Sequence, residues 1–240
     1  MKVVIIGGVA GGATAAARIR RLDEQAEIVV FERSGFISYA NCGLPYYIGG
    51  TIEDEDDLTL QTPESFWRRF RVKMNVHHEV TAIHPDSKTV TVKNLENGKI
   101  LTESYDKLVL SPGAKPIKPR FDGIDSDKIF ALRTVEDTLR LKKYTDEHHP
   151  KSAVVVGGGF IGIEVAENLR ELGIDVTLVE AADQLMAPFD RDMASFIHAE
   201  IRKNGIHLML DTMVEGFADT DCGIDVKLKN APTLHTDMVV

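Results

Sequence analysis

Cysteine is scarce in this sequence: Cys42 and Cys222 are the only two among 240 residues. Two cysteines cannot build the disulfide framework of a small secreted protein, so we expect a reducing, cytoplasmic location. The sequence also lacks an unbroken apolar run of about 18 residues, the length that a membrane-spanning helix needs. Glycines interrupt the apolar N-terminal stretch, which therefore predicts a strand and a helix rather than a signal peptide.

A surplus of positive charge is missing as well. The chain has 28 Lys and Arg against 37 Asp and Glu, which gives a net charge of −9. Binding to nucleic acid or to an anionic membrane surface is therefore not expected. The eight histidines form no group with the spacing of metal ligands, so no metal site is predicted. The 43% apolar and 27% charged residues are typical of a globular protein with one large domain or two smaller ones.

Two segments of the chain share one pattern. Residues 3–19 read VVIIGGVAGGATAAARI and residues 153–169 read AVVVGGGFIGIEVAENL. Each predicts a buried strand, a glycine-rich turn and a helix, followed by a second strand that ends at Glu32 or Glu180. This is the βαβ dinucleotide-binding pattern, in which glycines let the backbone approach a pyrophosphate at a helix N-terminus. The sequence therefore predicts an α/β fold with two Rossmann-like units.

The two copies differ in completeness. The second has the full G-x-G-x-x-G motif, at Gly157, Gly159 and Gly162. In the first, Gly7 and Gly12 match, Val9 replaces the middle glycine, and Gly8 and Gly11 flank it. One glycine-rich turn can serve packing alone, but two complete strand–turn–helix–strand contexts favour nucleotide binding. Glu180 suits a free ribose 2′-hydroxyl, and no arginine follows it directly, so NADH is expected in preference to NADPH.

The rest of the chain predicts the elements that connect and follow these units. A short helix is expected over residues 63–70, and strands from about 72 to 111 form an antiparallel insertion with a hairpin turn at Asn97-Gly98. Residues 114–128 resemble a linker, and Thr134 is a plausible N-cap of the helix that follows. After Glu180 we expect a helix near 190–203 and four short strands. The last strand stops at Val240 inside an apolar run, so a longer parent protein is expected.

Cys42 lies in the segment SYANCGLPYYIGG, residues 38–50. It precedes a helix predicted to begin near Leu44-Pro45, and a helix N-terminus favours the thiolate form of a nearby cysteine. Without a second thiol close in sequence, three oxidised forms stay open: a mixed disulfide, a sulfenic acid and a persulfide. A buried, inert cysteine is the alternative. Cys222 is interpreted as an incidental loop residue.

Three polar residues share one face of the first predicted helix, because Thr14, Arg18 and Arg21 are spaced by four and three positions. Guanidinium groups on such a face can bind phosphates. The alternative is that these arginines only face solvent or pair with Asp23 and Glu24.

Four motifs together resemble a known family: GGVAGGATAAARIRRLD, SYANCGLPYYIGG, ESYDKLVLSPGA and VVVGGGFIGIEVAENL. In this order they resemble the N-terminal portion of the pyridine nucleotide-disulfide oxidoreductases. The segment around Cys42 is most similar to the single-cysteine group, which contains coenzyme A-disulfide reductases, NADH oxidases, peroxidases and persulfide reductases. Phe70 departs from the lysine of some coenzyme A reductases, although Arg69 and Arg71 flank it.

The resemblance implies a flavoenzyme and a domain arrangement. Residues 1–120 are expected to bind FAD, residues 121–150 to form a linker and helix, and residues 151–240 to bind NADH. Electrons would pass from NADH through FAD to Cys42, with coenzyme A disulfide as the expected acceptor. Oxygen, peroxide or a persulfide is the alternative acceptor, and a non-catalytic nucleotide-binding fragment is a further alternative. The family also implies a homodimer, with a dimerisation domain that would follow Val240.

The patterns and the resemblance together give the candidate site residues. Cys42 is the redox thiol, and the coenzyme A candidates are Thr14, Arg18, Arg21, Ser38 and Asn41. The FAD candidates are Gly7, Gly8, Gly11, Gly12, Glu32, Arg33, Val80 and Gly113. The NADH candidates are Gly157, Gly159, Ile161, Gly162, Glu164 and Glu180. Of these, Glu164 resembles a family glutamate near the flavin–nicotinamide contact, and a plain helix residue is the alternative.

Overall fold

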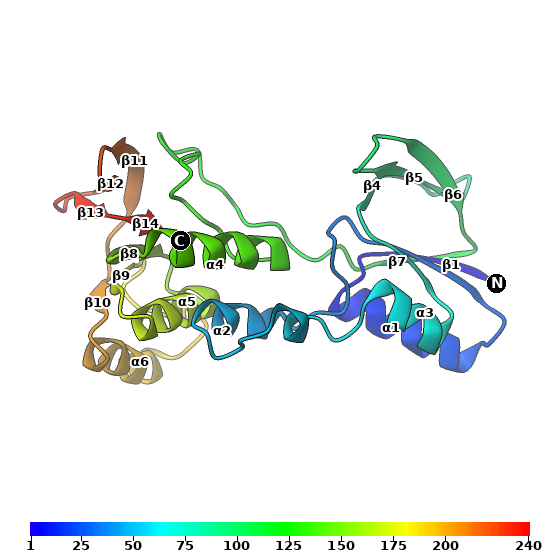
Figure 1. Cartoon of the computed structure of the whole chain (residues 1–240), viewed down its shortest axis with the longest axis horizontal. Coiled ribbons are helices and arrows are strands. Elements are labelled where there is room, and N and C mark those ends of the chain that lie inside the picture. Colours follow the sequence, from blue (N-terminus) through cyan, green and yellow to red (C-terminus); the bar gives the residue numbers. More distant parts are fainter. The chain divides into compact units, whose positions relative to one another are not determined.

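The computed structural model describes residues 1–240, which fold into two compact units, each with its own core (Figure 1). Unit 1 contains Met1–Asn41, Asp54–Lys115 and Thr134–Glu136. Unit 2 contains Cys42–Glu53, Pro116–Arg133 and Asp137–Val240.

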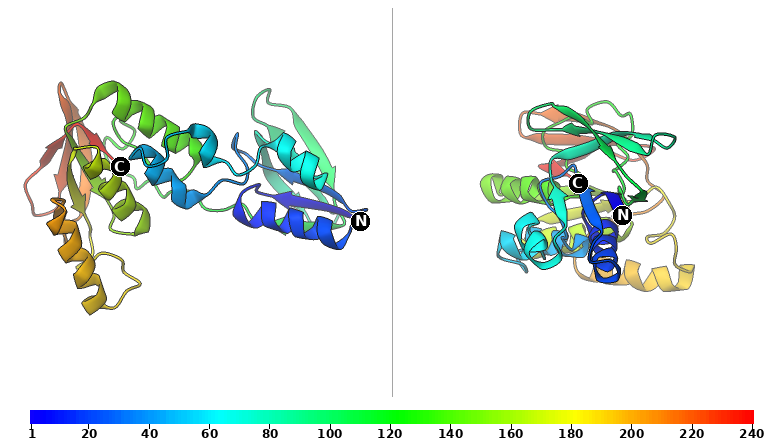
Figure 2. Two further views of the ribbon diagram at one scale, coloured as in Figure 1. Left: turned by 60° about the horizontal axis from the view of Figure 1, so that its bottom comes forward. Right: turned by 90° about the vertical axis from the view of Figure 1, so that its right-hand side faces the viewer.

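Unit 1 is built on a four-stranded parallel sheet in the order β3-β2-β1-β7. Its strands are β1 (Lys2–Ile6), β2 (Glu27–Phe31), β3 (Lys73–Asn75) and β7 (Lys107–Leu110). The helices α1 (Ala10–Leu22) and α3 (Pro63–Phe70) cover one face, as Figure 2 also shows. The second face packs against a three-stranded antiparallel sheet of β4 (His78–His84), β5 (Thr89–Asn94) and β6 (Ile100–Ser104).

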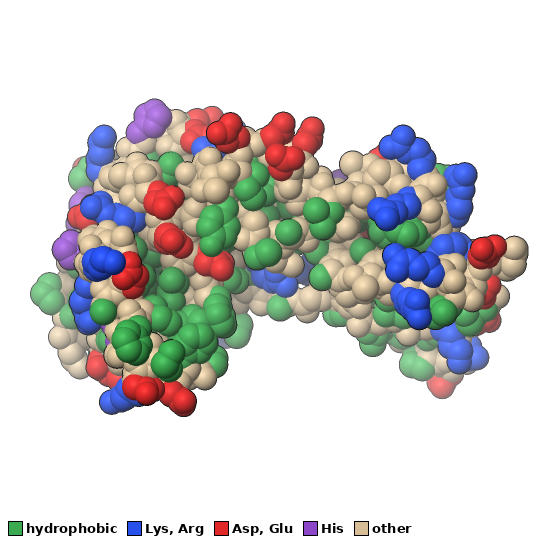
Figure 3. All heavy atoms as spheres, turned by 90° about the horizontal axis from the view of Figure 1, so that it is seen from below, with side chains coloured by type: hydrophobic (Ala, Val, Ile, Leu, Met, Phe, Trp, Pro, Cys, Tyr) green, Lys and Arg blue, Asp and Glu red, His purple; other side chains and the backbone are tan.

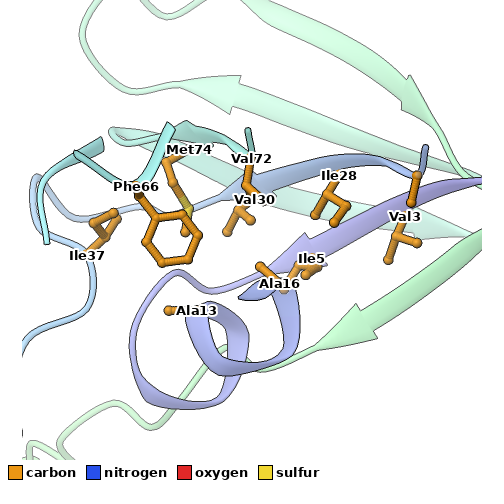
Figure 4. Close-up of a cluster of buried hydrophobic side chains, with 11 residues drawn as sticks. Val3, Ile5, Ala13, Ala16, Ile28, Val30, Ile37, Phe66, Val72 and Met74 are labelled. Carbon is orange, nitrogen blue, oxygen red and sulfur yellow. The ribbon is translucent and has the colours of Figure 1, made fainter. Parts of the chain in front are cut away.

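Alternation along the strands explains these three layers, because successive side chains of a strand point to opposite faces. Figure 4 shows the core between sheet and helices, in which Val3, Ile5, Ile28 and Val30 of the strands meet Ala13 and Ala16 of α1 and Phe66 of α3. The residues between them face the antiparallel sheet, namely Val4, Val29 and Phe31, which pack with Val90 and Val92. Strands buried on both faces need apolar residues on both, and the central positions of β1 and β2 are apolar, with charged residues only at the strand starts, Lys2 and Glu27.

Unit 2 repeats this plan with strand order β10-β9-β8-β14. The parallel strands are β8 (Ser152–Val156), β9 (Asp175–Val179), β10 (His207–Met209) and β14 (Met238–Val239). An antiparallel sheet of β11 (Val214–Thr220), β12 (Gly223–Leu228) and β13 (Leu234–Thr236) shares a core with one face. The helices of this part are α2 (Leu44–Ile48), α4 (Val135–His148, which begins in unit 1), α5 (Phe160–Glu171) and α6 (Arg191–Lys203).

Most of the predicted elements are confirmed. The expected helices at 63–70, near Leu44 and near 190–203 are present, and Gly98 has φ +73° in the hairpin turn between β5 and β6. One prediction is wrong: five strands follow α6 rather than four, because the run LHTDMVV divides into β13 and β14. Those two strands belong to different sheets, so the chain changes sheet at Asp237. The antiparallel insertion, predicted only for the first unit, is present in both.

No helix of the structure has both the length and the apolar character needed to span a lipid bilayer.

Candidate functional site

The first glycine-rich turn joins β1 to α1 and requires glycine at two positions. Gly7 has φ +98°, and its N–H donates to the carbonyl oxygen of Phe31 at 2.8 Å. A Cβ on Gly7 would lie 2.0 Å from the carbonyl oxygen of Ser111, and a Cβ on Gly12 would lie 1.8 Å from the carbonyl oxygen of Gly7. Helix α1 therefore approaches the end of β1 more closely than any larger residue permits.

The second turn joins β8 to α5 and shares the positive φ, the hydrogen bond and the close helix approach of the first, although a Cβ on Gly157 would meet no atom within 4 Å. Gly157 has φ +113° and donates to the carbonyl oxygen of Val179 at 2.9 Å, and a Cβ on Gly162 would lie 1.9 Å from the carbonyl oxygen of Gly157. Gly159 differs from Gly162, because no atom lies within 4 Å of the Cβ position there. It is the N-cap of α5, so its missing side chain leaves open space at a helix N-terminus. A pyrophosphate needs that space.

Glu32 and Glu180 each fix the turn of their own unit. The Oε2 of Glu32 accepts from the N–H of Gly8 at 2.8 Å, and its Oε1 accepts from Ser34 at 2.9 Å. The Oε2 of Glu180 accepts from Gly158 at 2.6 Å, and its Oε1 accepts from Ala182 at 2.8 Å. Each carboxylate oxygen can still accept a second hydrogen bond, which a ribose hydroxyl can supply.

After each glutamate a short loop returns to the glycine turn. We call these two loops, residues 33–38 and 181–186, the straps. Six positions after Glu32, Ser38 has φ +49° and donates its N–H to the carbonyl oxygen of Gly8 at 3.0 Å. Six positions after Glu180, Met186 has φ +54° and donates to the carbonyl oxygen of Gly158 at 2.8 Å. The residue before the last one of each strap is fully buried against the same glycine: Ile37 on Gly8 and Leu185 on Gly158.

Sequence reasoning missed the straps. The signal was available as a shared spacing, because ERSGFIS and EAADQLM both place a branched aliphatic residue five positions after the glutamate. Nor did the sequence indicate the pair between Arg191 and Asp183 beside the Glu180 loop, because Arg191 lies eleven positions after that glutamate.

A cavity of about 110 Å³ in unit 1 brings four FAD candidates together: Gly7, Glu32, Arg33 and Val80. His78, Glu79 and Pro112 also line it, and Gly113, with φ +70°, follows Pro112 in the chain. Gly11 lies on α1 above Ser111, whose Oγ would be 3.1 Å from a Cβ at that position.

A second cavity, of about 260 Å³, lies in unit 2 at the end of β8. Gly157, Ile161 and Gly162 line it, together with apolar residues of the 116–132 segment. Phe160, at the first position of α5, is 60% exposed and makes an edge-to-face contact with Phe189, with ring centres 6.2 Å apart.

Glu164 lies half-buried on α5. Burial, and secondly the charge of Glu167, raise the pKa of Glu164 above the ordinary glutamate range.

Cys42 is an exposed, free thiol in the 3₁₀ turn Asn41–Gly43, directly before α2. Helix α2 packs against α5. The contact is close at Gly49, where a Cβ would lie 2.2 Å from the Oδ1 of Asn168. The segment that holds the thiol is therefore anchored on the helix that begins at the second glycine turn.

The acidic side chains of α5 affect the pKa of Tyr46 on α2. The charge of Glu167 is the largest cause of a raised pKa of the Tyr46 hydroxyl, followed by desolvation and the charges of Glu164, Cys42 and Glu171.

The predicted phosphate-binding face of α1 is exposed. Thr14, Arg18 and Arg21 all reach solvent, and neither arginine takes part in any ion pair of the structure. Asp23 and Glu24, the alternative partners of these arginines, bond to Arg20 instead. Arg20 donates to the carbonyl oxygens of Glu24 at 2.7 Å and Asp23 at 3.2 Å. Figure 3 shows Lys and Arg side chains gathered on the part of the surface that carries α1 and α3, where Arg68, Arg69 and Arg71 are also exposed.

Two glycine-rich turns, each with a strand-end glutamate, define an α/β protein of the dinucleotide-binding class. The comparison with known families then identifies the group within that class. The model of the pyridine nucleotide-disulphide oxidoreductases matches residues 1–240, and the chain belongs to that family.

Individual relatives agree with this assignment. The chain is 41% identical over 218 residues to the coenzyme A disulfide reductase of Staphylococcus haemolyticus, covering 91% of this chain and 49% of the relative. It is 47% identical to the reduced Bacillus anthracis protein CoADR-RHD, with a TM-score of 0.95 over 99% of this chain and 42% of that one. It is 36% identical to a water-forming NADH oxidase from Lactobacillus brevis bound to NADH, with a TM-score of 0.93 over 100% of this chain and 52% of that one. The chain thus spans about half the length of the curated relatives that it matches.

Proposed function

We propose that this chain is the nucleotide-binding and thiol-bearing part of an FAD-dependent NADH:disulfide oxidoreductase, with coenzyme A disulfide as its substrate. The observation that carries the proposal is the duplication of one cradle, glycine turn plus glutamate, in a chain with an exposed thiol at Cys42. Family membership and the similarity to a coenzyme A disulfide reductase support it.

The residues of unit 1 fit FAD. Gly7 and Gly12 let the turn approach a pyrophosphate, and Glu32 offers acceptors for the ribose hydroxyls. The cavity at Glu32, Arg33 and Val80 has an apolar wall suited to the adenine end. When bound, FAD supplies two-electron exchange between a nicotinamide and a thiol–disulfide pair.

The residues of unit 2 fit NADH. Gly159 leaves room for the pyrophosphate at the N-terminus of α5, and Glu180 accepts from a free 2′-hydroxyl but repels a 2′-phosphate. Binding of NADH by the Lactobacillus brevis oxidase supports this choice of nucleotide.

Cys42 carries the thiol–disulfide chemistry. The Cys42 thiolate attacks one sulfur of the disulfide, so that a mixed disulfide forms, the original S–S bond breaks, and the leaving thiolate takes up a proton to give one thiol. Two electrons and a proton then reduce the mixed disulfide, release the second thiol and restore Cys42. In total, NADH, one proton and one disulfide give NAD⁺ and two thiols. No second thiol is required, since the substrate itself supplies the partner sulfur.

The substrate site is proposed on the basic face of unit 1. Arg18 and Arg21 have no ion-pair partner and are free to bind phosphate groups, with Thr14 on the same helix face. Ser38 and Asn41 precede the thiol in the chain and are proposed to position the substrate near it.

The visible absorption spectrum of the purified chain is the first test. A yellow protein with flavin absorption supports the proposal. A colourless protein that does not take up added FAD, but still binds NADH, supports a non-catalytic nucleotide-binding fragment instead.

The second test compares two thiol variants of the protein. Cys42→Ser is expected to abolish NADH-dependent reduction of coenzyme A disulfide, a loss of more than about a thousandfold, while NADH binding is unchanged. Cys222→Ser is the matched control and should keep full activity. Normal turnover by Cys42→Ser contradicts the mechanism.

A second function is supported by the similarity to the water-forming NADH oxidase. In that case Cys42 cycles through a sulfenic acid, and a persulfide acceptor would use the same thiol. NADH consumption measured separately with coenzyme A disulfide, oxygen, peroxide and a persulfide distinguishes these acceptors.

A further inference from the structure

Cys222, Asp225 and His235 lie together on the antiparallel sheet of unit 2. Cys222 is an exposed free thiol in the turn between β11 and β12. Asp225 and His235 are directly opposite each other on β12 and β13. The Oδ1 of Asp225 is 2.8 Å from the Nδ1 of His235, and the Nε2 of His235 is 3.5 Å from the Sγ of Cys222. A carboxylate, an imidazole and a thiol are therefore connected in series.

Gly223 makes room for this arrangement. In β12, Ile224 points into the core, whereas Gly223 and Asp225 lie on the opposite face with His235. A Cβ at position 223 would lie 2.4 Å from the carbonyl oxygen of Thr236 and 3.1 Å from the Nε2 of His235. Because glycine has no Cβ, the imidazole can lie over this residue and reach the thiol.

Each group has a chemical task. Asp225 accepts the hydrogen bond of the Nδ1–H of His235, which leaves Nε2 as the acceptor. That nitrogen faces the sulfur of Cys222 and can remove its proton. The thiolate, rather than the thiol, is the form that attacks a disulfide. The same order of groups activates nucleophiles on unrelated folds, so geometry rather than sequence position defines it.

We propose that Cys222 is a second reactive thiol, which His235 and Asp225 activate for modification by small uncharged or cationic disulfides. The sulfur of Cys222 attacks one sulfur of R–S–S–R, so that a Cys222–S–S–R bond forms and the original S–S bond breaks. R–S⁻ leaves with the electron pair of that bond and takes up the proton that His235 removed. One thiol and one disulfide give one mixed disulfide and one thiol, and no other oxidant takes part.

The charge of the hairpin selects the disulfide. Asp219, Asp221 and Asp225 are all in or beside it, and only Asp219 has a lysine partner, Lys128 at 3.0 Å. Asp221 is exposed and directly precedes the thiol. These carboxylates outnumber the one lysine of the hairpin, the exposed Lys227 of β12, so the net charge repels an anionic disulfide and attracts a cationic one. The site does not depend on the nucleotide-binding function proposed above.

The test uses the 240-residue chain with Cys42→Ser, so that Cys222 is the only thiol. Uncharged dithiodipyridine is added, the released thione is followed by absorbance, and intact mass confirms one adduct. His235→Gln and Asp225→Asn are each expected to slow the reaction by about tenfold or more. Asp221→Asn is the matched control, because it removes the same charge without touching the imidazole, and it should react at least as fast as its parent.

Circular dichroism and thermal unfolding establish that each variant is folded, and the two activating residues give two independent measurements. An unchanged rate in both folded variants overturns the proposal, as does equal slowing by Asp221→Asn. The preferred charge of the disulfide is tested with cationic cystamine and anionic dithiobis(nitrobenzoate). The rate of Cys222 with each is divided by the rate at which N-acetylcysteine reacts with the same disulfide, which corrects for intrinsic reactivity. The normalised rate should be higher for cystamine, and the reverse order contradicts the assigned class.

Discussion

Each of the two strand-end glutamates performs a structural task with the same oxygens that a ribose would use. Glu32 is only 8% exposed, yet both its oxygens bond to backbone N–H groups of the turn and of the loop beyond it. Glu180 repeats this pattern in unit 2. A carboxylate that accepts two backbone bonds is fixed in direction before any ligand arrives, so a ribose meets an oriented acceptor.

Glu164 gives a prediction about pH. Burial and Glu167 raise the pKa of Glu164, so the folded chain binds its proton more tightly than the unfolded chain does. This contribution to stability is complete at acid pH and is lost as the pH rises through the raised pKa. Glu164→Gln removes the loss. The variant should unfold at the same temperature as its parent at acid pH and at a higher temperature at neutral pH.

Thermal unfolding measured by circular dichroism across that range checks the sign. A variant that is less stable than its parent by the same amount at every pH would show that the side chain acts through packing rather than through its charge.

The glycines of each turn act at the level of the element, because they set how closely a helix approaches its strand. Gly12 and Gly162 allow α1 and α5 to contact the carbonyl oxygen of the first glycine of each turn. Gly159 has another role, since it packs against nothing and only keeps space open. We therefore propose that these two glycines of one motif, three positions apart, serve stability and binding separately.

Gly162→Ala and Gly159→Ala make a matched pair that tests this separation. Gly162→Ala forces a Cβ to 1.9 Å from the carbonyl oxygen of Gly157, so we expect a loss of about 1–3 kcal/mol in the free energy of unfolding. Gly159 has φ −82°, and no atom lies within 4 Å of its Cβ position. Gly159→Ala should therefore change the free energy of unfolding by less than about 0.5 kcal/mol. Its affinity for NADH should nevertheless fall.

Denaturant unfolding and a fluorescence titration with NADH measure the two effects. The opposite pattern, with Gly159→Ala unstable and Gly162→Ala neutral, would contradict the assigned roles.

The sequence predicted these turns because their signals are local: glycines, a buried strand and a glutamate follow each other within about 25 residues. The contacts that it could not predict join residues from separate strands or loops. Ser38 and Met186 reach their turns only after the second strand has been placed, and His235 meets Cys222 only through the register of β12 and β13. From sequence alone Cys222 is interpreted as incidental, because DTDCGID contains no histidine and His235 lies 13 positions further on.

At the scale of the whole molecule, the chain contains the same architecture twice. Both units have four parallel strands in equivalent order and a three-stranded antiparallel sheet inserted before the last of them. Each has its own core, with Val30 and Phe66 in unit 1 and Val154 and Phe217 in unit 2. Because each unit has its own core, a nucleotide bound to one unit should stabilise that unit and not the other.

Hydrogen exchange can therefore distinguish the two ligands. NADH is expected to protect amides of residues 157–162 and 180–186, and FAD those of residues 7–12 and 32–38. At a ligand concentration of about 100 times Kd, the stabilisation of the unit that binds amounts to about 2.7 kcal/mol. Protection of residues 7–12 by NADH, in place of 157–162, would show that the two assignments are reversed.

The straps at Ser38 and Met186 have a thermodynamic consequence. A carboxylate and a backbone N–H fix each turn from two sides, so the turn loses its conformational entropy when the protein folds. A nucleotide that enters such a rigid loop has no disorder to remove, and more of its interaction energy appears as affinity.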